Sequence, residues 1–251
     1  MLSRCTPCYD ESFFEEMNDD VLRSAKTVVP AVLKMVQPKS IIDVGCGLGT
    51  WLSVFHAHGV DTILGIDGDY INRAKLLIPS TCFTPIDLTK PFAIQQRFDL
   101  AVSLEVAEHL PVACASQFVE SLCRVAPAIL FSAAVPGQGG THHVNEQWPE
   151  YWRQLFASQG FRMLDPFRPS LWYDHTVALC YRQNLFLFVR EDLLKANPVL
   201  LQLPEVKDEN GLMLLAPYIA FGNVGLRATV KRLPRLLLDS LARRFHNLFG
   251  K

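Results

Sequence analysis

The segment IIDVGCGLGT, residues 41–50, constrains the fold of this chain more than any other part of the sequence. Its first four residues are mostly branched and apolar, which predicts a short buried strand. Gly45, Gly47 and Gly49 follow, and glycine lets a backbone turn tightly and approach a ligand without a Cβ in the way. Residues 51–57 then carry apolar groups at helical spacing. A strand, a glycine-rich turn and a helix N-terminus in this order form the nucleotide-type site of an open α/β sheet.

The rest of the chain repeats this alternation of strand and helix. A helical lead-in over residues 9–37 ends at Pro38, and an amphipathic helix spans residues 114–125. Apolar runs that alternate with helical segments predict a mostly parallel, doubly wound α/β sheet. The predicted strands are residues 41–44, 62–66, 82–88, 98–104, 128–135, 161–164 and 185–189.

Composition excludes several classes of protein. With 49% hydrophobic and 20% charged residues, the 251-residue chain can bury a full core, and its net charge of −1 gives no overall attraction to nucleic acid. It starts without a secretory signal and has no stretch of about 18 apolar residues, so we expect a cytoplasmic protein. Seven scattered cysteines indicate reduced thiols. The pair Cys5 and Cys8 lacks a second pair or histidines at ligand spacing, so we expect no metal site.

Two aspartates follow predicted strands at the edge where α/β sheets bind ligands. Asp67 ends the second strand, where a carboxylate can accept two hydrogen bonds from ribose hydroxyls. The alternative for Asp67 is a helix cap, but Asp69 is the better candidate to cap a helix beginning near Tyr70. Asp87 follows the third strand and could cap the turn before Thr89; the alternative, a contact with an adenine amino group, is what the family resemblance given below implies, and both readings stay open.

The fourth and fifth strands lead into segments rich in polar groups. Leu104 and Glu105 end the fourth strand, and Glu108 and His109 lie one helical turn further on, where they would face Glu105. For His109, a bond to nearby backbone is a plainer expectation than catalysis. After the fifth strand, residues 141–152 (THHVNEQWPEYW) form the densest polar and aromatic cluster in the chain. Histidine is a natural general base near neutral pH, although Asn145 and Trp148 could equally cap and pack a helix.

Several of these motifs resemble those of one family. The pattern Asp43-x-Gly45-x-Gly47-x-Gly49 is similar to motif I of the class I S-adenosylmethionine-dependent methyltransferases, and residues 98–110 resemble motif IV and its continuation. Residues 143–152 (HVNEQWPEYW) and 181–184 (YRQN) resemble a subgroup from bacterial glycan and natural-product clusters, in which His143 is the matching histidine. The resemblance covers roughly residues 39–190.

The resemblance implies a Rossmann-like methyltransferase fold in which the last strand is antiparallel and inserted between strands five and six. It implies S-adenosylmethionine as cofactor and a hydroxyl of a sugar, glycan precursor or related small metabolite as acceptor. His143 is the candidate base, with Glu146 orienting it or binding substrate, while Arg182 either meets an anionic acceptor or pairs with a carboxylate. The implied cofactor residues are Asp43, Gly45, Gly47, Gly49, Asp67, Asp87, Leu104 and Glu105, and the implied substrate residues are His142, Asn145, Trp148 and Arg182.

Other functions remain as alternatives to this reading. We expect an N-terminal helical cap at 1–38, a cofactor-binding domain at 39–190 and a C-terminal extension at 191–251. Residues 227–251 carry seven Lys or Arg against one Asp and predict a basic amphipathic helix, which could contact a membrane surface, a partner or a second copy of the chain. A non-catalytic scaffold that binds through this helix is therefore the main alternative. A nucleotide-sugar oxidoreductase would need a different glycine spacing, and no Asn-Pro-Pro-Tyr motif points to nucleic-acid methylation.

Overall fold

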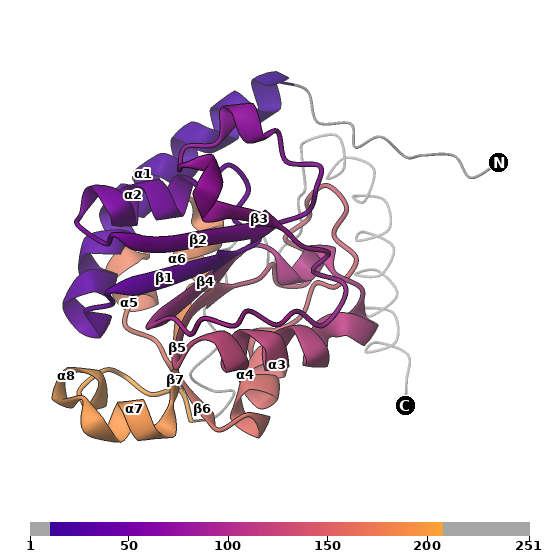
Figure 1. Cartoon of the computed structure of the whole chain (residues 1–251). Coiled ribbons are helices and arrows are strands. Elements are labelled where there is room, and N and C mark those ends of the chain that lie inside the picture. Colours follow the sequence, from indigo (N-terminus) through magenta and orange to yellow (C-terminus); the bar gives the residue numbers. More distant parts are fainter. Residues whose placement is uncertain (1–10, 208–251) are drawn as a thin grey trace, which may run out of the picture.

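The computed structural model describes residues 11–207, so the expectations for the pair Cys5 and Cys8 and for the 227–251 helix lie outside the described part of the chain. The centre of the molecule is a seven-stranded sheet with the order β3-β2-β1-β4-β5-β7-β6 (Figure 1). All pairs are parallel except those of β7, which runs antiparallel to both β5 and β6. The predicted topology is therefore confirmed, including the inserted last strand. The strands are β1 Ser40–Val44, β2 Thr62–Asp67, β3 Phe83–Pro85, β4 Leu100–Leu104, β5 Ala128–Ser132, β6 Phe161–Leu164 and β7 Phe186–Arg190.

The sheet is buried on both faces because helices cover each of them. Alternate residues of a strand point to opposite faces, so Ile41 of β1 joins one apolar core and Ile42 joins the other. Leu100 and Ala101 of β4 divide in the same way. This explains why the central strands are continuous apolar runs rather than alternating polar and apolar residues.

The helices form a layer on each face of the sheet (Figure 1). Residues of α1, α2, α5 and α6 contribute to one core, and residues of α3 and α4 contribute to the other. The predicted lead-in is confirmed as α1, which ends two residues before Pro38. No helix within residues 11–207 has both the length and the apolar character needed to cross a membrane. The helices are α1 Glu11–Val36, α2 Thr50–Ala57, α3 Ala115–Val125, α4 Pro149–Ser158, α5 Arg168–Leu171, α6 Leu179–Asn184, α7 Glu191–Ala196 and α8 Pro198–Leu201.

The connection between β2 and β3 differs from the prediction. It contains short 3₁₀ turns at Arg73–Lys75 and Ser80–Cys82 and no α-helix. The expectation that Asp69 caps a helix is therefore wrong: Asn72 caps the first turn, and Asp69 pairs with Arg73 at 3.1 Å. The reason is a contact distant in sequence. The Leu77 N–H donates to the Leu48 carbonyl at 2.8 Å, which ties this connection to the glycine-rich loop instead of letting it coil.

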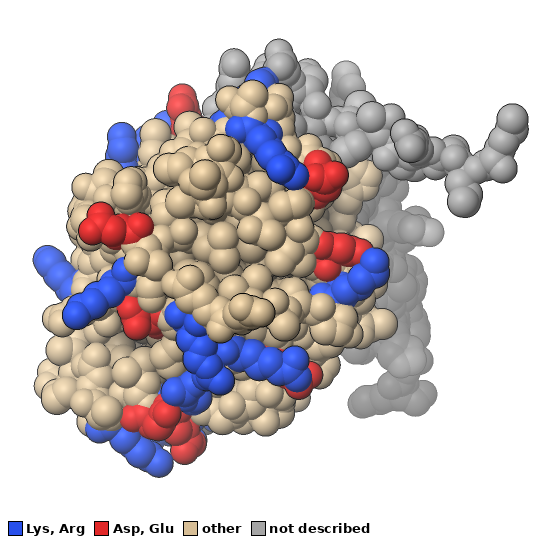
Figure 2. Space-filling view, viewed as in Figure 1, with Lys and Arg blue, Asp and Glu red and all other residues tan. Residues whose placement is uncertain are grey.

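One charged pair lies wholly inside the protein. Arg168, at the start of α5, is fully buried, and its guanidinium donates two hydrogen bonds to Asp165 at 2.6 and 2.8 Å. The guanidinium also lies 4.4 Å from the centre of the Phe186 ring. On the surface, by contrast, basic and acidic side chains occur beside one another over much of the face seen in Figure 2. Such neighbouring exposed pairs contribute little to stability, whereas breaking a buried pair is costly.

Candidate active site

The glycine-rich loop meets the end of β4 at the carboxyl edge of the sheet. β1 lies between β2 and β4, so the chain order reverses at β1, and open α/β sheets bind ligands at such a point. Gly45 has a φ of 84°, and a Cβ placed on it would lie 2.4 Å from Val106 Cγ2. Its N–H donates to the Ile66 carbonyl at 2.8 Å. The first glycine is therefore required both by its conformation and by the closeness of the segment after β4.

Asp67 joins this loop to the end of β2. One carboxylate oxygen accepts from the Gly47 N–H at 2.8 Å, and the other accepts from the Gly68 N–H at 2.6 Å and the Tyr70 hydroxyl at 2.5 Å. The helix cap considered for Asp67 is not formed, since no helix begins directly after it and the first turn that follows, Arg73–Lys75, is capped by Asn72. A carboxylate at this edge that already accepts from a hydroxyl is suited to bind a diol.

Asp43 lies beneath the loop and is 3% exposed. Its Oδ2 atom has no hydrogen-bond partner among the described residues. Burial raises the pKa of this carboxyl well above its ordinary value, and the nearby charge of Asp67 raises it further. A buried polar group without a partner lowers the stability of the folded state. Asp43 is therefore a destabilising group next to the predicted cofactor loop.

The remaining predicted cofactor residues divide into two groups. Asp87 lies in an exposed turn, where it accepts from the Thr89 N–H and hydroxyl and pairs with Lys90 at 2.9 Å; these contacts lower its pKa to about 2, with the Thr89 side chain as the largest cause. It therefore caps the turn, and its contact with adenine stays a prediction. Leu104, in contrast, ends β4 at the edge that carries the glycine loop, and Glu105 follows it directly.

Glu105 takes a left-handed backbone conformation, with φ 54°, which directs the chain out of the sheet. Its carboxylate accepts from Gln138 Nε2 at 2.8 Å, and Gln138 accepts from Asn184 Nδ2 at 2.8 Å. Burial raises the pKa of Glu105, while hydrogen bonds from Gln138, Ser132 and Asn184 oppose the shift. This chain of polar groups connects the ends of β4 and α6 and the loop after β5.

His143 and Glu146 are brought together as predicted. The Nδ1 atom of His143 lies 2.9 Å from Glu146 Oε1, and both side chains are mostly buried, 12% and 20% exposed. Glu146 also accepts from the N–H groups of Gly137 and Gly139 at 2.8 and 2.9 Å. Partial burial opposes ionisation of Glu146, but the hydrogen bonds from His143 and from the two backbone groups outweigh it and lower its pKa.

This arrangement fixes the direction of the imidazole. An ionised Glu146 is an acceptor only, so His143 donates through Nδ1 and keeps the lone pair of Nε2 for another partner. Gly140 leaves room for the ring, since a Cβ there would lie 2.2 Å from Nε2. A histidine oriented by a carboxylate in this way can act as a base or as a metal ligand.

The four predicted substrate residues differ in exposure and in their hydrogen-bond partners. His142 has a φ of 59° and is exposed, and Trp148 is 48% exposed. Asn145 is buried, donates to the Ala107 carbonyl at 3.4 Å and accepts from Gln147. It does not cap α4, because Trp148 is the N-cap residue and no side chain makes a capping hydrogen bond there. Arg182 donates to the Trp172 carbonyl at 3.0 Å. Contacts of these four residues with a substrate stay predictions.

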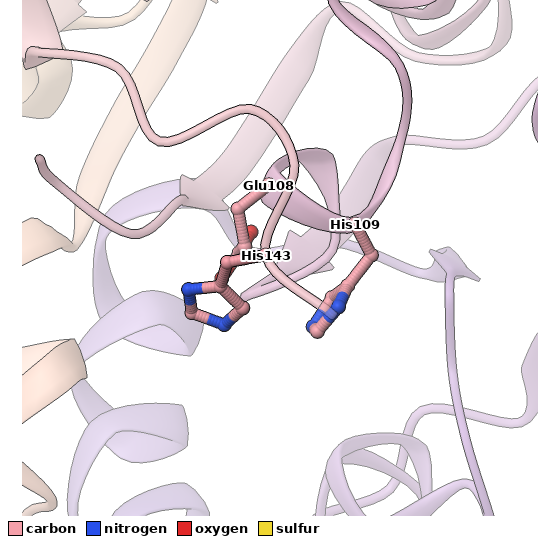
Figure 3. Close-up of side chains that lie close together, drawn as sticks. All are labelled: Glu108, His109 and His143. Atoms are coloured by element: carbon pink, nitrogen blue, oxygen red, sulfur yellow. The ribbon is translucent and has the colours of Figure 1, made fainter. Parts of the chain in front are cut away.

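One group of residues was missed from the sequence. Potential ligand atoms of Glu108, His109 and His143 all lie within 4.8 Å of one another (Figure 3). Glu108 and His109 belong to a 3₁₀ turn, Ala107–His109, after β4, and the Glu108 carbonyl accepts from the Val144 and Asn145 N–H groups of the loop that carries His143. The only sequence signal was the pair Glu108-His109 close to Glu105, because the third member comes from a separate loop.

The pKa values in this group are strongly shifted. Burial raises the pKa of Glu108 to about 9, and the charge of Glu105 contributes in the same direction. Burial lowers the pKa of His109, and the neighbouring His143 lowers it further. The rings of the two histidines meet edge to face with their centres 4.9 Å apart. Shifted pKa values gathered at one edge of a sheet are typical of a functional site.

Comparison with known proteins agrees with this geometry. Residues 9–124 match the model of a methyltransferase domain family. The structure is similar to that of the sugar N-methyltransferase KedS8 from Streptoalloteichus sp ATCC 53650, with a TM-score of 0.56, 17% identity and coverage of 76% of this chain and 98% of that one. It is also similar to DesVI of Streptomyces venezuelae (0.53, 15%, 72% and 96%) and to magnesium protoporphyrin IX methyltransferase (ChlM) from Synechocystis PCC 6803 with bound SAH (0.50, 18%, 71% and 88%). No curated protein matches the sequence.

These similarities and the strand order give one conclusion. The family model covers the lead-in helix and the first four strands, and the structural similarity to KedS8 covers 76% of the chain. The chain has the Rossmann-like fold of the class I S-adenosylmethionine (SAM)-dependent methyltransferases, and its residues 9–124 match the model of a methyltransferase domain family.

Proposed function

We propose that this protein transfers the methyl group of SAM to a hydroxyl of a sugar, a glycan precursor or a related small metabolite. The observation that carries the proposal is the His143–Glu146 contact of 2.9 Å in the loop after β5, at the same edge of the sheet as the glycine-rich loop. A hydroxyl must lose its proton to become a good nucleophile, and an imidazole oriented by a carboxylate is the usual base for this step.

The proposed cofactor site lies between the glycine-rich loop and the end of β4. Gly45, Gly47 and Gly49 would pass the methionine part of SAM, and Asp67 would accept hydrogen bonds from the ribose hydroxyls. The contact between Asp67 and the Tyr70 hydroxyl supports this role, because a ribose hydroxyl needs the same kind of acceptor. Glu105, at the end of β4, would flank the cofactor.

The proposed acceptor site lies around the loop of His143. Two apolar side chains of this loop are exposed, Val144 by 60% and Trp148 by 48%. An exposed indole offers an apolar face to a sugar ring, while nearby polar groups bind its hydroxyls. The similarity to KedS8, a sugar N-methyltransferase, supports a sugar acceptor and leaves the methylated atom to be decided by experiment.

In the proposed reaction, a lone pair of the acceptor oxygen attacks the methyl carbon of SAM in line with the carbon–sulfur bond. The carbon–oxygen bond forms as the carbon–sulfur bond breaks. The electron pair of the broken carbon–sulfur bond stays on sulfur, giving S-adenosylhomocysteine (SAH). The oxygen's proton passes to Nε2 of His143, whose new charge Glu146 stabilises. Much of the rate acceleration in such a displacement comes from holding the two reactants in line.

The proposal is tested by following label from SAM with a tritiated methyl group into a panel of nucleotide sugars, matched pairwise so that a hydroxyl in one replaces an amino group in the other. We expect label in a hydroxylated sugar, and a loss of at least a hundredfold in kcat for His143→Ala, since general-base catalysis contributes about 10²–10⁴-fold. His58→Ala is the matched control, because His58 lies exposed at the end of α2. Transfer only to amino sugars, or full activity of His143→Ala, would contradict the proposal.

A further inference from the structure

We propose that Glu108, His109 and His143 form a binding site for a divalent transition-metal ion. Their potential ligand atoms lie within 4.8 Å of one another, and Figure 3 shows the three side chains grouped together beside the turn after β4. Two imidazoles and one carboxylate are a donor set that suits Mn²⁺, Fe²⁺, Co²⁺ or Zn²⁺.

The strongest evidence is the state of Glu108. Its side chain is 0% exposed and lies against a second carboxyl, that of Glu105, and no Lys or Arg pairs with it among the described residues. Two buried carboxyls side by side without a positive group to balance them are costly and call for an explanation. A cation bound between the carboxyl and the two histidines would supply the missing partner.

A second observation concerns the support of the proposed ligands. His143 contacts Glu146 through Nδ1, and Glu146 is itself held by two backbone N–H groups. Metal-binding histidines usually donate their other ring N–H to a carboxylate in this way, which orients the ring and makes the ligating nitrogen more basic. The Glu108 carbonyl meanwhile accepts from the Val144 and Asn145 N–H groups, so the two segments that carry the ligands are fastened to each other.

The site needs only a small closure. Ligand atoms about 2.1 Å from a metal ion lie about 3.0–3.4 Å from one another. The potential ligand atoms of Glu108, His109 and His143 lie within 4.8 Å of one another. His109 lies near the surface, where its side chain can rotate once its hydrogen bond with the His142 backbone is released, whereas Glu108 and His143 are largely enclosed. Three protein ligands leave further positions open, as catalytic rather than structural metal sites do.

The role of the ion in methyl transfer rests on the proposed function, but the binding of the ion does not. An acceptor hydroxyl that coordinates the ion becomes more acidic and releases its proton to solvent, after which its oxygen attacks the methyl carbon. In this ion-bound form the ion activates the hydroxyl and His143 is its ligand, whereas the role of His143 as the base belongs to the ion-free protein. The same loop then binds acceptors that offer two neighbouring oxygens, such as vicinal diols, since these can fill two open positions.

The binding site is tested with the chelator-treated full chain titrated with Mn²⁺, following free Mn²⁺ by its electron paramagnetic resonance signal. We expect one site in the wild type and at least a tenfold higher Kd for Glu108→Gln, His109→Ala and His143→Ala. His142→Asn is the matched control, since it removes the adjacent histidine and places a residue that tolerates a positive φ; its Kd should stay within twofold of the wild type. His109 lies at the surface, and circular dichroism checks that His109→Ala is folded.

Two results would overturn the site: no Mn²⁺ binding by folded wild type up to millimolar concentration, or wild-type affinity in His109→Ala. The two proposals can fail separately. Mn²⁺ binding without methyl transfer would leave the metal site and contradict the proposed function. Methyl transfer unaffected by the chelator would uphold the proposed function and overturn the role of the ion.

Discussion

Replacing Gly45 by alanine tests whether the glycine-rich loop is set by backbone conformation, by its contact with the segment after β4, or by both. Gly45 has a φ of 84°, and the added Cβ would lie 2.4 Å from Cγ2 and 2.7 Å from Cγ1 of Val106. Gly47 provides the comparison, because its φ is 53° and a Cβ there would meet nothing within 4 Å. The two substitutions therefore share the conformational strain and differ in the steric overlap.

The expected magnitudes follow from these contacts. A left-handed conformation costs an alanine about 1–2 kcal/mol, and overlap in a packed region adds about 1–3 kcal/mol. Gly47→Ala should lower the free energy of unfolding by about 1–2 kcal/mol through strain alone. Gly45→Ala should lower it by about 2–5 kcal/mol, the sum of the two effects.

Urea unfolding of the ligand-free protein measures these changes, and Val106→Ala isolates the overlap. Both atoms that an alanine at position 45 would strike, Cγ1 and Cγ2, are absent from Val106→Ala. In that background Gly45→Ala should cost only the strain, about 1–2 kcal/mol. If the costs of the two substitutions simply add, or if Gly45→Ala costs no more than Gly47→Ala, the contact between the loop and Val106 does not constrain the fold as described.

Three further predictions concern buried or shielded groups. Because the pKa of Asp43 is raised in the folded state, the ligand-free wild type should lose stability as pH rises from about 4 through the raised pKa; Asp43→Asn should remove this loss in urea unfolding at several pH values, and an identical pH dependence in both proteins would contradict it. Tyr70→Phe should bind SAH roughly fivefold more tightly by calorimetry, because no Tyr70–Asp67 hydrogen bond worth about 1 kcal/mol must be broken; weaker binding would show that the Tyr70 hydroxyl assists the ligand. Arg168→Leu should lower the free energy of unfolding by about 3–5 kcal/mol, because it leaves Asp165 buried without its partner; a loss below about 1 kcal/mol would refute that cost.

The fold could be predicted because its signals are local. The run of apolar residues in 41–44, the glycine spacing after it and the repeated alternation of strand and helix each depend on neighbours in the sequence. The predicted contact between His143 and Glu146 was also local, since Glu146 comes three positions after His143 and the loop between β5 and α4 positions both. Burial of the central strands on both faces follows from their continuous apolar character.

The errors arose where distant segments meet. The helix expected after Asp69 is absent because Leu77 donates to Leu48, a contact between the glycine-rich loop and the β2–β3 connection that no local pattern reveals. Asp87 was left between two roles, and the turn contacts with Thr89 and Lys90 decide only that it caps the turn.

The group formed by Glu108, His109 and His143 was missed for the same reason. Sequence spacing suggested that Glu108 and His109 would face Glu105, and it offered no means of placing His143 beside them. The hydrogen bonds from the Val144 and Asn145 N–H groups to the Glu108 carbonyl, and from the Asn145 side chain to the Ala107 carbonyl, bring the two loops together. Sites assembled from separate loops at one edge of a sheet need the fold before their members can be recognised.

Calorimetric titration of the purified protein with SAM and with SAH, repeated on Asp67→Ala, is the most direct test of the cofactor site. We predict micromolar binding that Asp67→Ala weakens by at least tenfold, or about 1.4 kcal/mol, because the variant removes the carboxylate proposed to bind the ribose. No binding of either ligand by the folded wild type would contradict the assignment of the glycine-rich loop and Asp67 as a SAM site.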